Sequence, residues 1–271
     1  MGVEQRGAYV SPYLRDAWPA ETYDARVAQV WNDRDLGLYL DLAAASGGPL
    51  LELAVGTGRV ALPLARAGHE IVGLDQSPHM LAVARRKLAQ EPPEVQARVT
   101  LLEGDMSDFA LARRFALILI PFRTFQALLT RAAQRGCLES CARHLAPGGR
   151  LVLDVFNPRL SRISQPGGAD DPTHEYPQPD GSVIRQHGHA EFDLGEQMLH
   201  DWMWCERVTP DGAERVREEE LRLRYLFRFE LEWMLEACGF EIEALYGDFD
   251  KSPFGSDSPE MIPVARKRKS P

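Results

Sequence analysis

Short apolar runs alternate with segments of helical periodicity through the middle of the chain. The runs predict strands over residues 50–55, 70–75, 98–105, 115–121 and 150–156. The segments between them predict helices over residues 59–67, 77–90 and 131–145. This alternation is typical of a parallel sheet with helices on both faces, in which ligands bind at the carboxyl ends of the strands.

The same pattern is preceded by one predicted helix and resumes near the end of the chain. Apolar spacing predicts a helix over 24–45 that ends at Gly47-Gly48-Pro49. A helix over 230–237 is followed by predicted strands over 240–248 and 261–266. We therefore expect an α/β fold with a sheet of seven, mostly parallel strands.

An antiparallel insertion interrupts this pattern after Asn157-Pro158. Residues 159–182 are rich in Pro, Gly and Asp, and three long alternating segments follow, separated by hairpin-turn sequences. These segments span 183–193, 197–208 and 213–226. They predict a cap of three or four antiparallel strands.

The predicted elements divide the 271 residues into one large domain with an insertion. We expect residues 1–48 to form an N-terminal helical segment that closes over a cofactor. Residues 49–158 and 227–271 form the core, and residues 159–226 form the cap on the substrate side.

Composition narrows the range of partners. The net charge is −9, and the only dense basic run, at 266–269, is expected to be a solvated tail. Polymeric nucleic acid is therefore not expected as a substrate. No apolar run is long enough to span a bilayer, so no membrane partner is expected either.

The start of the chain and the cysteines favour a cytoplasmic protein. Residues 1–10 lack the basic and apolar regions of a signal peptide. The four cysteines form no CxxC pair, and Cys137 and Cys141 share one face of a predicted helix as small apolar residues. We expect them to stay reduced.

A glycine-rich turn follows the first predicted strand, in the sequence LLELAVGTGRV at 50–60. Gly56-x-Gly58-x-x-Ala61 fits a dinucleotide site, and Asp75, at the end of the second strand, would bind ribose hydroxyls there. On these residues alone, an NAD(P)-dependent oxidoreductase, a non-catalytic nucleotide-binding module and another nucleotide-dependent enzyme all remain open.

Three further features distinguish these alternatives. Glu52 lies inside the first strand, where a dinucleotide needs no acid but the positive amino-acid end of another cofactor does. Asp105-Met106 follows the third strand and suits an adenine ring. A turn at Pro147-Gly148-Gly149 precedes the fifth strand. An oxidoreductase would need a proton-relay pair such as Tyr-x-x-x-Lys near the fourth strand, and the sequence has none.

With these motifs in this order, the chain resembles the class I S-adenosylmethionine-dependent methyltransferases. The resemblance covers residues 50–157 and 229–266, and it extends to bacterial small-molecule enzymes with an antiparallel cap after the fifth strand. It implies a Rossmann-like fold with S-adenosylmethionine as cofactor and S-adenosylhomocysteine as product. The implied reaction is in-line methyl transfer to an N or O atom of a small polar metabolite.

The resemblance also assigns contacts around the methionine part of the cofactor. The backbone at Gly56 and Gly58 would pass beneath it, and Glu52 would orient it. Ile120 would offer its carbonyl to the ammonium group, and Tyr23 would close over this end.

Ala54 departs from the family motif, which more often has glycine there. We expect it to be an extended strand residue, for which a positive φ is not required and alanine costs little.

The remaining cofactor contacts lie on the next two strands. Asp75 would accept hydrogen bonds from both ribose hydroxyls, and Gln76 and Met80 would flank the adenosine. Asp105 would bind the adenine amino group, and Met106 would pack on the ring.

The acceptor side is less specific, and the sequence identifies no catalytic residue. Arg123 and Asn157 are positioning candidates, Arg123 as a clamp for a carboxylate or phosphate. A surface ion pair and a turn residue are the alternatives for these two. Phe122 and Phe125 either wall the pocket or belong to the core.

The cap supplies further candidates. Met198, His200, Trp202 and Trp204 share one strand face because side chains alternate, and this face either lines the pocket or packs the cap onto the core. Tyr246 is expected to point into the cleft. Besides a small-molecule acceptor, the exposed cap edge is able to pair in a homodimer. No metal is expected.

Overall fold

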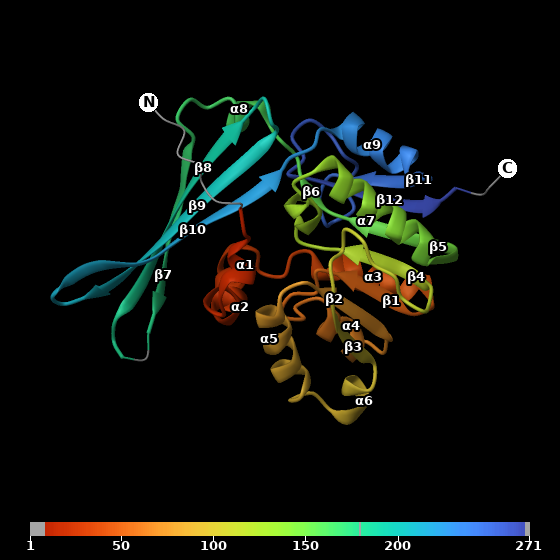
Figure 1. The fold of residues 1–271 in the computed structure, drawn as a ribbon, viewed down its shortest axis with the longest axis horizontal. Coiled ribbons are helices and arrows are strands. Elements are labelled where there is room, and N and C mark those ends of the chain that lie inside the picture. The colour runs from red at the N-terminus through yellow and green to blue at the C-terminus, as the bar shows by residue number, and fades with distance from the viewer. Residues whose placement is uncertain (1–8, 179, 269–271) are drawn as a thin grey trace.

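The main sheet of this computed structural model is the predicted one. The structure describes residues 9–178 and 180–268, and within them the sheet has the order β11-β12-β5-β4-β1-β2-β3, with β6 beside β12 (Figure 1). Strands β1 to β5 pair in parallel, whereas β12 runs antiparallel to both β5 and β11. The strands are β1 (Leu50–Leu53), β2 (Ile71–Asp75), β3 (Val99–Glu103), β4 (Phe115–Ile120), β5 (Leu145–Leu153), β6 (Val155–Phe156), β11 (Phe240–Tyr246) and β12 (Glu260–Lys267). The predicted fold class is confirmed.

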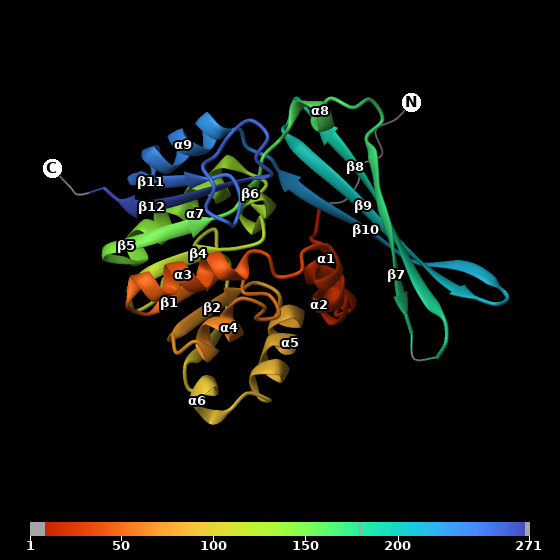
Figure 2. The ribbon, with the colours of Figure 1, turned by 180° about the vertical axis from the view of Figure 1, so that it is seen from behind.

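Helices cover both faces of this sheet because its strands are apolar on both sides (Figure 2). On one face, Leu51 and Leu53 pack with residues of α7 and α9. On the other face, Leu50 packs with residues of α3, α4 and α5. The helices of the core are α3 (Leu36–Ser46), α4 (Ala61–Arg66), α5 (Pro78–Leu88), α6 (Pro93–Gln96), α7 (Arg131–His144) and α9 (Arg228–Ala237). Cys137 and Cys141 on α7 are buried, as expected.

The single helix predicted over 24–45 is wrong. The structure has α2 (Trp18–Val30) and α3, preceded by the short helix α1 (Pro12–Arg15). Between α2 and α3, Asn32 and Asp33 have φ values of 50° and 49°, which a continuous right-handed helix does not allow. Asn and Asp tolerate this conformation better than most residues, so the break has a local cause.

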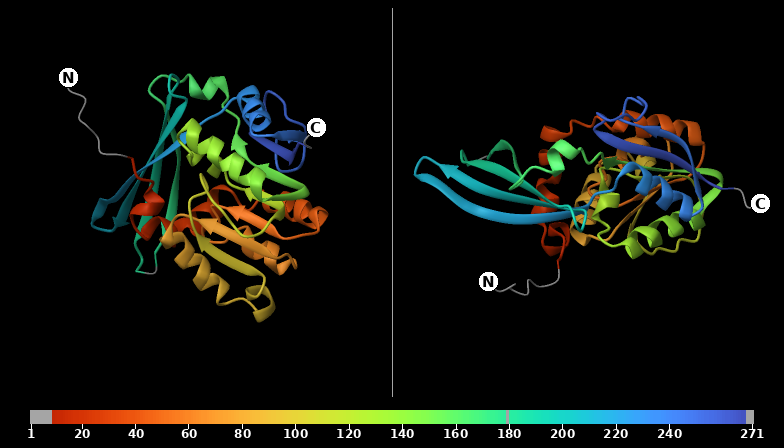
Figure 3. Two further views of the ribbon diagram at one scale, coloured as in Figure 1. Left: turned by 45° about the vertical axis from the view of Figure 1, so that its right-hand side comes forward. Right: turned by 90° about the horizontal axis from the view of Figure 1, so that it is seen from above.

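The cap is a separate antiparallel sheet in the order β10-β9-β8-β7. Its strands are β7 (Ala169–Pro177), β8 (Val183–Asp193), β9 (Met198–Thr209) and β10 (Gly212–Arg224), and α8 (Leu160–Ile163) precedes them. Strand β7 falls in the region where only turn-rich sequence was recognised. The long strands project from the core, and α1 and α2 lie between the cap and the main sheet (Figure 3).

Three expectations concern the chain as a whole: membrane spans, the basic run at 266–269 and the division into domains. None of the described helices is long and apolar enough to cross a membrane. Arg266 and Lys267 of the basic run belong to the end of β12, while Lys269 lies outside the described residues. The division into domains stays a prediction, and residues 1–8 of its first segment also lie outside the described part.

Candidate active site

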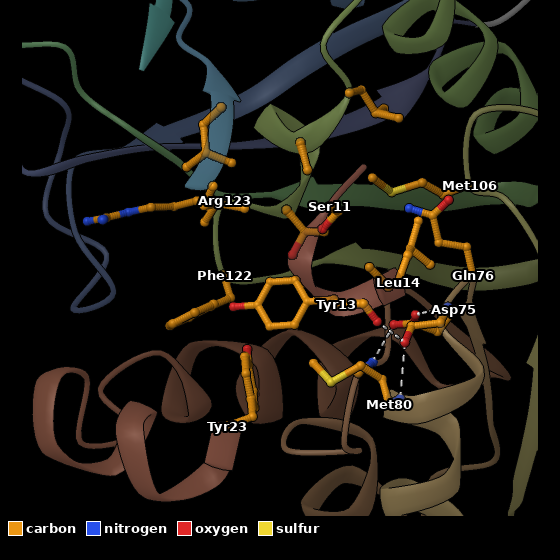
Figure 4. A pocket seen from close by; sticks show the side chains of 18 of the residues that line it. Ser11, Tyr13, Leu14, Tyr23, Asp75, Gln76, Met80, Met106, Phe122 and Arg123 are labelled. Atoms are coloured by element: carbon orange, nitrogen blue, oxygen red, sulfur yellow. Dashed lines mark hydrogen bonds between the residues drawn. The ribbon is translucent and has the colours of Figure 1, made fainter. Parts of the chain in front are cut away.

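A cavity of about 520 Å³ lies at the carboxyl ends of the central strands. Its lining comes from the turns after β1, β2, β3 and β4, from α1 and α2, and from two strands of the cap (Figure 4). A switch in strand order creates a crevice at this edge of an open α/β sheet, because β1 lies between β4 and β2. The volume is in the range of about 300–1,000 Å³ that is usual for small-molecule sites.

Asp75 ties the glycine turn to the next strand. Its Oδ2 accepts a hydrogen bond from the backbone N–H of Gly56 at 2.8 Å, and its Oδ1 accepts one from Ser77 at 2.8 Å. Burial raises the pKa of this carboxyl, and the two backbone N–H groups counteract the rise. Asp75 therefore shapes the turn as well as lining the cavity.

The turn itself has left-handed backbone. Gly56 and Gly58 have φ values of 56° and 78°, and a Cβ at Gly58 would lie 3.3 Å from Cγ of Leu62. Glycine is suited to both positions because it has no Cβ to clash. The backbone can therefore come close to a bound ligand.

The expectation for Ala54 is wrong. Ala54 has a φ of 55°, because the chain leaves the sheet immediately after Leu53 and turns under the cavity. A left-handed conformation costs an L-residue about 1–2 kcal/mol. Alanine in place of glycine therefore strains the backbone at this position.

Two consecutive left-handed residues follow β4. Phe122 and Arg123 have φ values of 61° and 60°. The buried carboxylate of Asp154 accepts hydrogen bonds from their backbone N–H groups at 2.8 and 2.7 Å, and from the hydroxyl of Tyr39. Burial raises the pKa of Asp154 to about 7, while its hydrogen bonds oppose this rise. The sequence analysis missed Asp154, and the signal that marks it is an isolated acid inside the apolar run LVLDVF at 151–156.

Two arginines at the cavity share one buried carboxylate. Arg34 and Arg123 both line the cavity, and their guanidinium groups lie 2.6 and 2.5 Å from Oε1 of Glu260. Both guanidinium groups also lie over the ring of Trp31. The alternative of an ion pair for Arg123 is thus realised, although Arg123 remains partly exposed at the cavity. Arg34 was missed because it lay inside the wrongly predicted continuous helix.

Comparison with known proteins agrees with this geometry. A family model described as a methyltransferase domain matches residues 50–149. The dTDP-3-amino-3,6-dideoxy-alpha-D-glucopyranose N,N-dimethyltransferase of Streptomyces fradiae is 34% identical over 198 residues, which cover 73% of this chain and 72% of that protein. The chain belongs to the class I S-adenosylmethionine-dependent methyltransferases.

Solved structures extend the likeness to the cap. The CcbJ methyltransferase from Streptomyces caelestis has a TM-score of 0.76 and 27% identity, covering 96% of this chain and 100% of that one. The glycopeptide N-methyltransferase MtfA in complex with S-adenosylmethionine has a TM-score of 0.56 and 27% identity, covering 82% of each chain. The methyltransferase therefore uses S-adenosylmethionine and releases S-adenosylhomocysteine, and the oxidoreductase alternative is excluded.

The residues of the methyltransferase fit this cofactor. The left-handed glycines leave room for close approach of a ligand. Glu52 is buried, and in the described part of the chain its Oε2 has no hydrogen-bond partner. Burial raises the pKa of this carboxyl well above its usual range. A carboxyl with one unpaired oxygen beside the glycine turn suits a ligand with a positively charged end.

Most of the predicted cofactor residues come together at the cavity. The lining includes eight of them: Tyr23, Ala54, Gly56, Asp75, Gln76, Met80, Asp105 and Met106. Glu52, Gly58 and Ile120 lie outside it, and both Glu52 and Ile120 are buried. The assigned contacts stay predictions.

Five of the six predicted substrate residues lie outside the lining. Phe125 is fully buried in the core, as its alternative interpretation held. The Nδ2 of Asn157 donates to the carbonyl oxygens of Ser256 and Ser258, which makes it a turn residue. Tyr246 packs against the core cluster on the α3 side of the sheet. The cap residues Trp202 and Trp204 also lie outside the lining, so Arg123 is the one substrate candidate of the six that lines the cavity.

The expected cap face is the wrong one. Asp201, Leu221 and Leu223 line the cavity, and Asp201 pairs with Leu221 across β9 and β10. Because side chains alternate along a strand, Trp202 and Trp204 lie on the opposite face. There the ring of Trp204 stacks on that of His187, with centroids 5.2 Å apart.

Proposed function

We propose that this methyltransferase transfers a methyl group to the amino nitrogen of a small polar acceptor. The observation that carries the proposal is that the cofactor motifs and the inner face of the cap line the same cavity. Its size suits a small molecule rather than a polymer. The relatives that support the choice of nitrogen are the dTDP-aminosugar N,N-dimethyltransferase of Streptomyces fradiae and the glycopeptide N-methyltransferase MtfA.

The chain contributes positioning rather than covalent chemistry. S-adenosylmethionine supplies an electrophilic methyl group when it is bound. Asp75 holds the adenosine side, and the glycine turn passes beneath the methionine part. Tyr23, Trp31 and Phe122 form a run of edge-to-face rings, with Phe122 at 6.0 and 4.9 Å from the other two, and this aromatic wall excludes water. Figure 4 shows Tyr13 and Tyr23 directed to the space beside Phe122.

Of the two positioning candidates, Arg123 and Asn157, Arg123 remains in this proposal. Together with Arg34 it offers more guanidinium donors than the single carboxylate of Glu260 can satisfy. An anionic group on the acceptor would bind to the remaining donors. We further propose a cytoplasmic location, no nucleic-acid partner, and a homodimer paired through the cap edge.

The test uses the full chain with S-adenosylhomocysteine and with S-adenosylmethionine carrying a deuterated methyl group. Calorimetry is expected to show binding of S-adenosylhomocysteine. Mass spectrometry is expected to show methyl transfer to the 3-amino group of dTDP-3-amino-3,6-dideoxyglucose or to the nitrogen of another small amine in a panel. A product methylated on oxygen, with the amines left unmodified, would contradict the proposal.

A further inference from the structure

Asp201 is a carboxylate without a partner at the wall of the cavity. It lies on β9 and lines the cavity from the cap side. Within residues 9–178 and 180–268 its buried Oδ1 has no hydrogen-bond partner. Buried polar atoms are nearly always hydrogen-bonded in native proteins, so an orphaned one that faces a ligand cavity points to a bound group.

The neighbouring cations are engaged elsewhere. Arg162 on α8 forms an ion pair with Asp171 on β7 at 3.2 Å. Arg26 on α2 lies 3.9 Å from Glu219, and its guanidinium group lies over the ring of Trp18. In the described part of the chain no cation is within 4.0 Å of Asp201, which leaves its carboxylate without an ion pair.

The surroundings of Asp201 set its protonation. Burial and, to a smaller extent, the charge of Asp171 raise its pKa, Arg162 and Arg26 oppose the rise, and the resulting pKa is about 6. Burial raises the pKa of the Tyr13 phenol on α1, and the nearby Asp201 carboxylate adds to the rise. Asp201 is therefore ionised at neutral pH, beside the apolar side chains of Leu221 and Leu223.

We propose that Asp201 binds the amino group of the methyl acceptor and thereby selects amines over alcohols. The inference rests on the proposed function and names the residue that recognises the nitrogen. A carboxylate only accepts hydrogen bonds, so an amine, with its N–H donors, satisfies it. Because the site is partly desolvated, the interaction is stronger than on an open surface.

The same carboxylate favours the transfer step. As the nitrogen lone pair forms the new N–C bond, the C–S bond breaks and its electron pair stays on sulfur. The positive charge moves from the sulfonium to the nitrogen, which becomes an ammonium. A fixed negative charge beside that nitrogen stabilises the developing charge.

The test compares Asp201→Asn with the wild type on matched amine and alcohol acceptors. One pair is dTDP-3-amino-3,6-dideoxyglucose and dTDP-6-deoxyglucose, and further pairs of small amines and alcohols use other skeletons. The wild type is expected to methylate amines in preference to their alcohols. In Asp201→Asn, kcat/KM for amines should fall at least about tenfold, while the affinity for S-adenosylhomocysteine is unchanged.

Three controls separate this role from a structural one. Glu206→Gln removes a carboxylate on the opposite face of the same strand as Asp201, outside the cavity lining, and it should leave amine preference intact. Asp201→Glu should recover part of the activity because it restores the charge. Asp201→Asn should melt no lower than the wild type, because it removes a buried charge that has no ion pair.

The pH profile adds a readout that misfolding does not imitate. For the wild type, kcat/KM should fall more steeply below about pH 6 than protonation of the amine acceptor alone explains, because Asp201 is protonated as well, and this additional fall should be missing in Asp201→Asn. The proposal is overturned if Asp201→Asn keeps wild-type kcat/KM for amines, if it unfolds at lower temperature, or if the wild type shows no preference for amines. N-methylation at the wild-type rate in Asp201→Asn would overturn the role of Asp201 alone, whereas O-methylation by the wild type would overturn the proposed function as well.

Discussion

The carboxylate of Asp154 accepts a hydrogen bond from the backbone N–H of Arg123, with 2.7 Å between Oδ2 and the nitrogen. Asp154 follows β5, and Arg123 follows the neighbouring parallel strand β4. The contact stabilises a left-handed turn that directs Phe122 to the aromatic wall and Arg123 to Glu260. One buried acid thus determines the geometry of the acceptor side without lining the cavity.

Asp154→Asn should damage this turn. The amide has one oxygen for three donors, so at least one buried N–H or O–H loses its acceptor. We expect a loss of about 1–3 kcal/mol in the free energy of unfolding, measured with urea. The value of kcat should fall while binding of S-adenosylhomocysteine is retained. Asp108→Asn, at an exposed position, is the matched control, and an equal effect of the two variants would contradict the role of Asp154.

The same carboxyl predicts a pH dependence of stability. Its pKa rises from 3.8 to about 7 on folding, so the folded state binds more protons than the unfolded state between these values. Stability contributed by this group is therefore lost as the pH rises from 3.8 to about 7. Urea unfolding across this window should show a shallower decline for Asp154→Asn than for the wild type. Parallel curves would show that Asp154 does not titrate there.

Ala54→Gly should stabilise the protein. Glycine removes the clash of a Cβ at a φ of 55°, which outweighs the entropy that glycine loses on folding. We expect a gain of about 0.5–1 kcal/mol in the free energy of unfolding. The control is Ala44→Gly on the exposed side of α3, which should cost about 1 kcal/mol. A loss of stability in Ala54→Gly would show that the strain is relieved in another way.

Asp75→Ala should weaken cofactor binding more than it weakens the fold. It removes the acceptor of the Gly56 and Ser77 N–H groups together with the predicted ribose contact. We expect a loss of about 2–4 kcal/mol in the binding of S-adenosylhomocysteine by calorimetry. Thr130→Ala removes the N-cap of α7 and should lower stability at unchanged affinity. Unchanged affinity in Asp75→Ala would contradict its assigned role.

The two faces of the cap should differ in their effect on the acceptor. Leu223→Ala, on the inner face, should raise KM for the acceptor because it enlarges the cavity and removes an apolar contact from its wall. Trp204→Ala, on the outer face, should leave KM unchanged even though it removes a larger side chain. Steady-state kinetics with one amine acceptor measures KM for both variants. A raised KM in Trp204→Ala with an unchanged KM in Leu223→Ala would show that the face of Trp204 meets the acceptor.

The strand and helix pattern of the core followed directly from the sequence. Apolar runs such as 115–121 and turn signals such as Ser77-Pro78 act locally, and β4 and α5 lie close to the predicted positions. The cofactor end was also predictable, because Asp75 and Asp105-Met106 stand at strand ends, and parallel strands bring those ends together.

The sequence by itself determined the alternation of elements, the cofactor class and the presence of an antiparallel cap, since each depends on short-range periodicity or on motifs within one strand and its turn. Only the tertiary structure decided which cap face meets the cavity, because strands alternate and docking against α1 and α2 selects one of two equivalent faces. It also decided the left-handed backbone at Ala54 and the hydrogen bond from the Arg123 backbone N–H to Asp154. A single φ angle and a contact between two strand ends depend on segments far apart in the chain, and no local pattern records them.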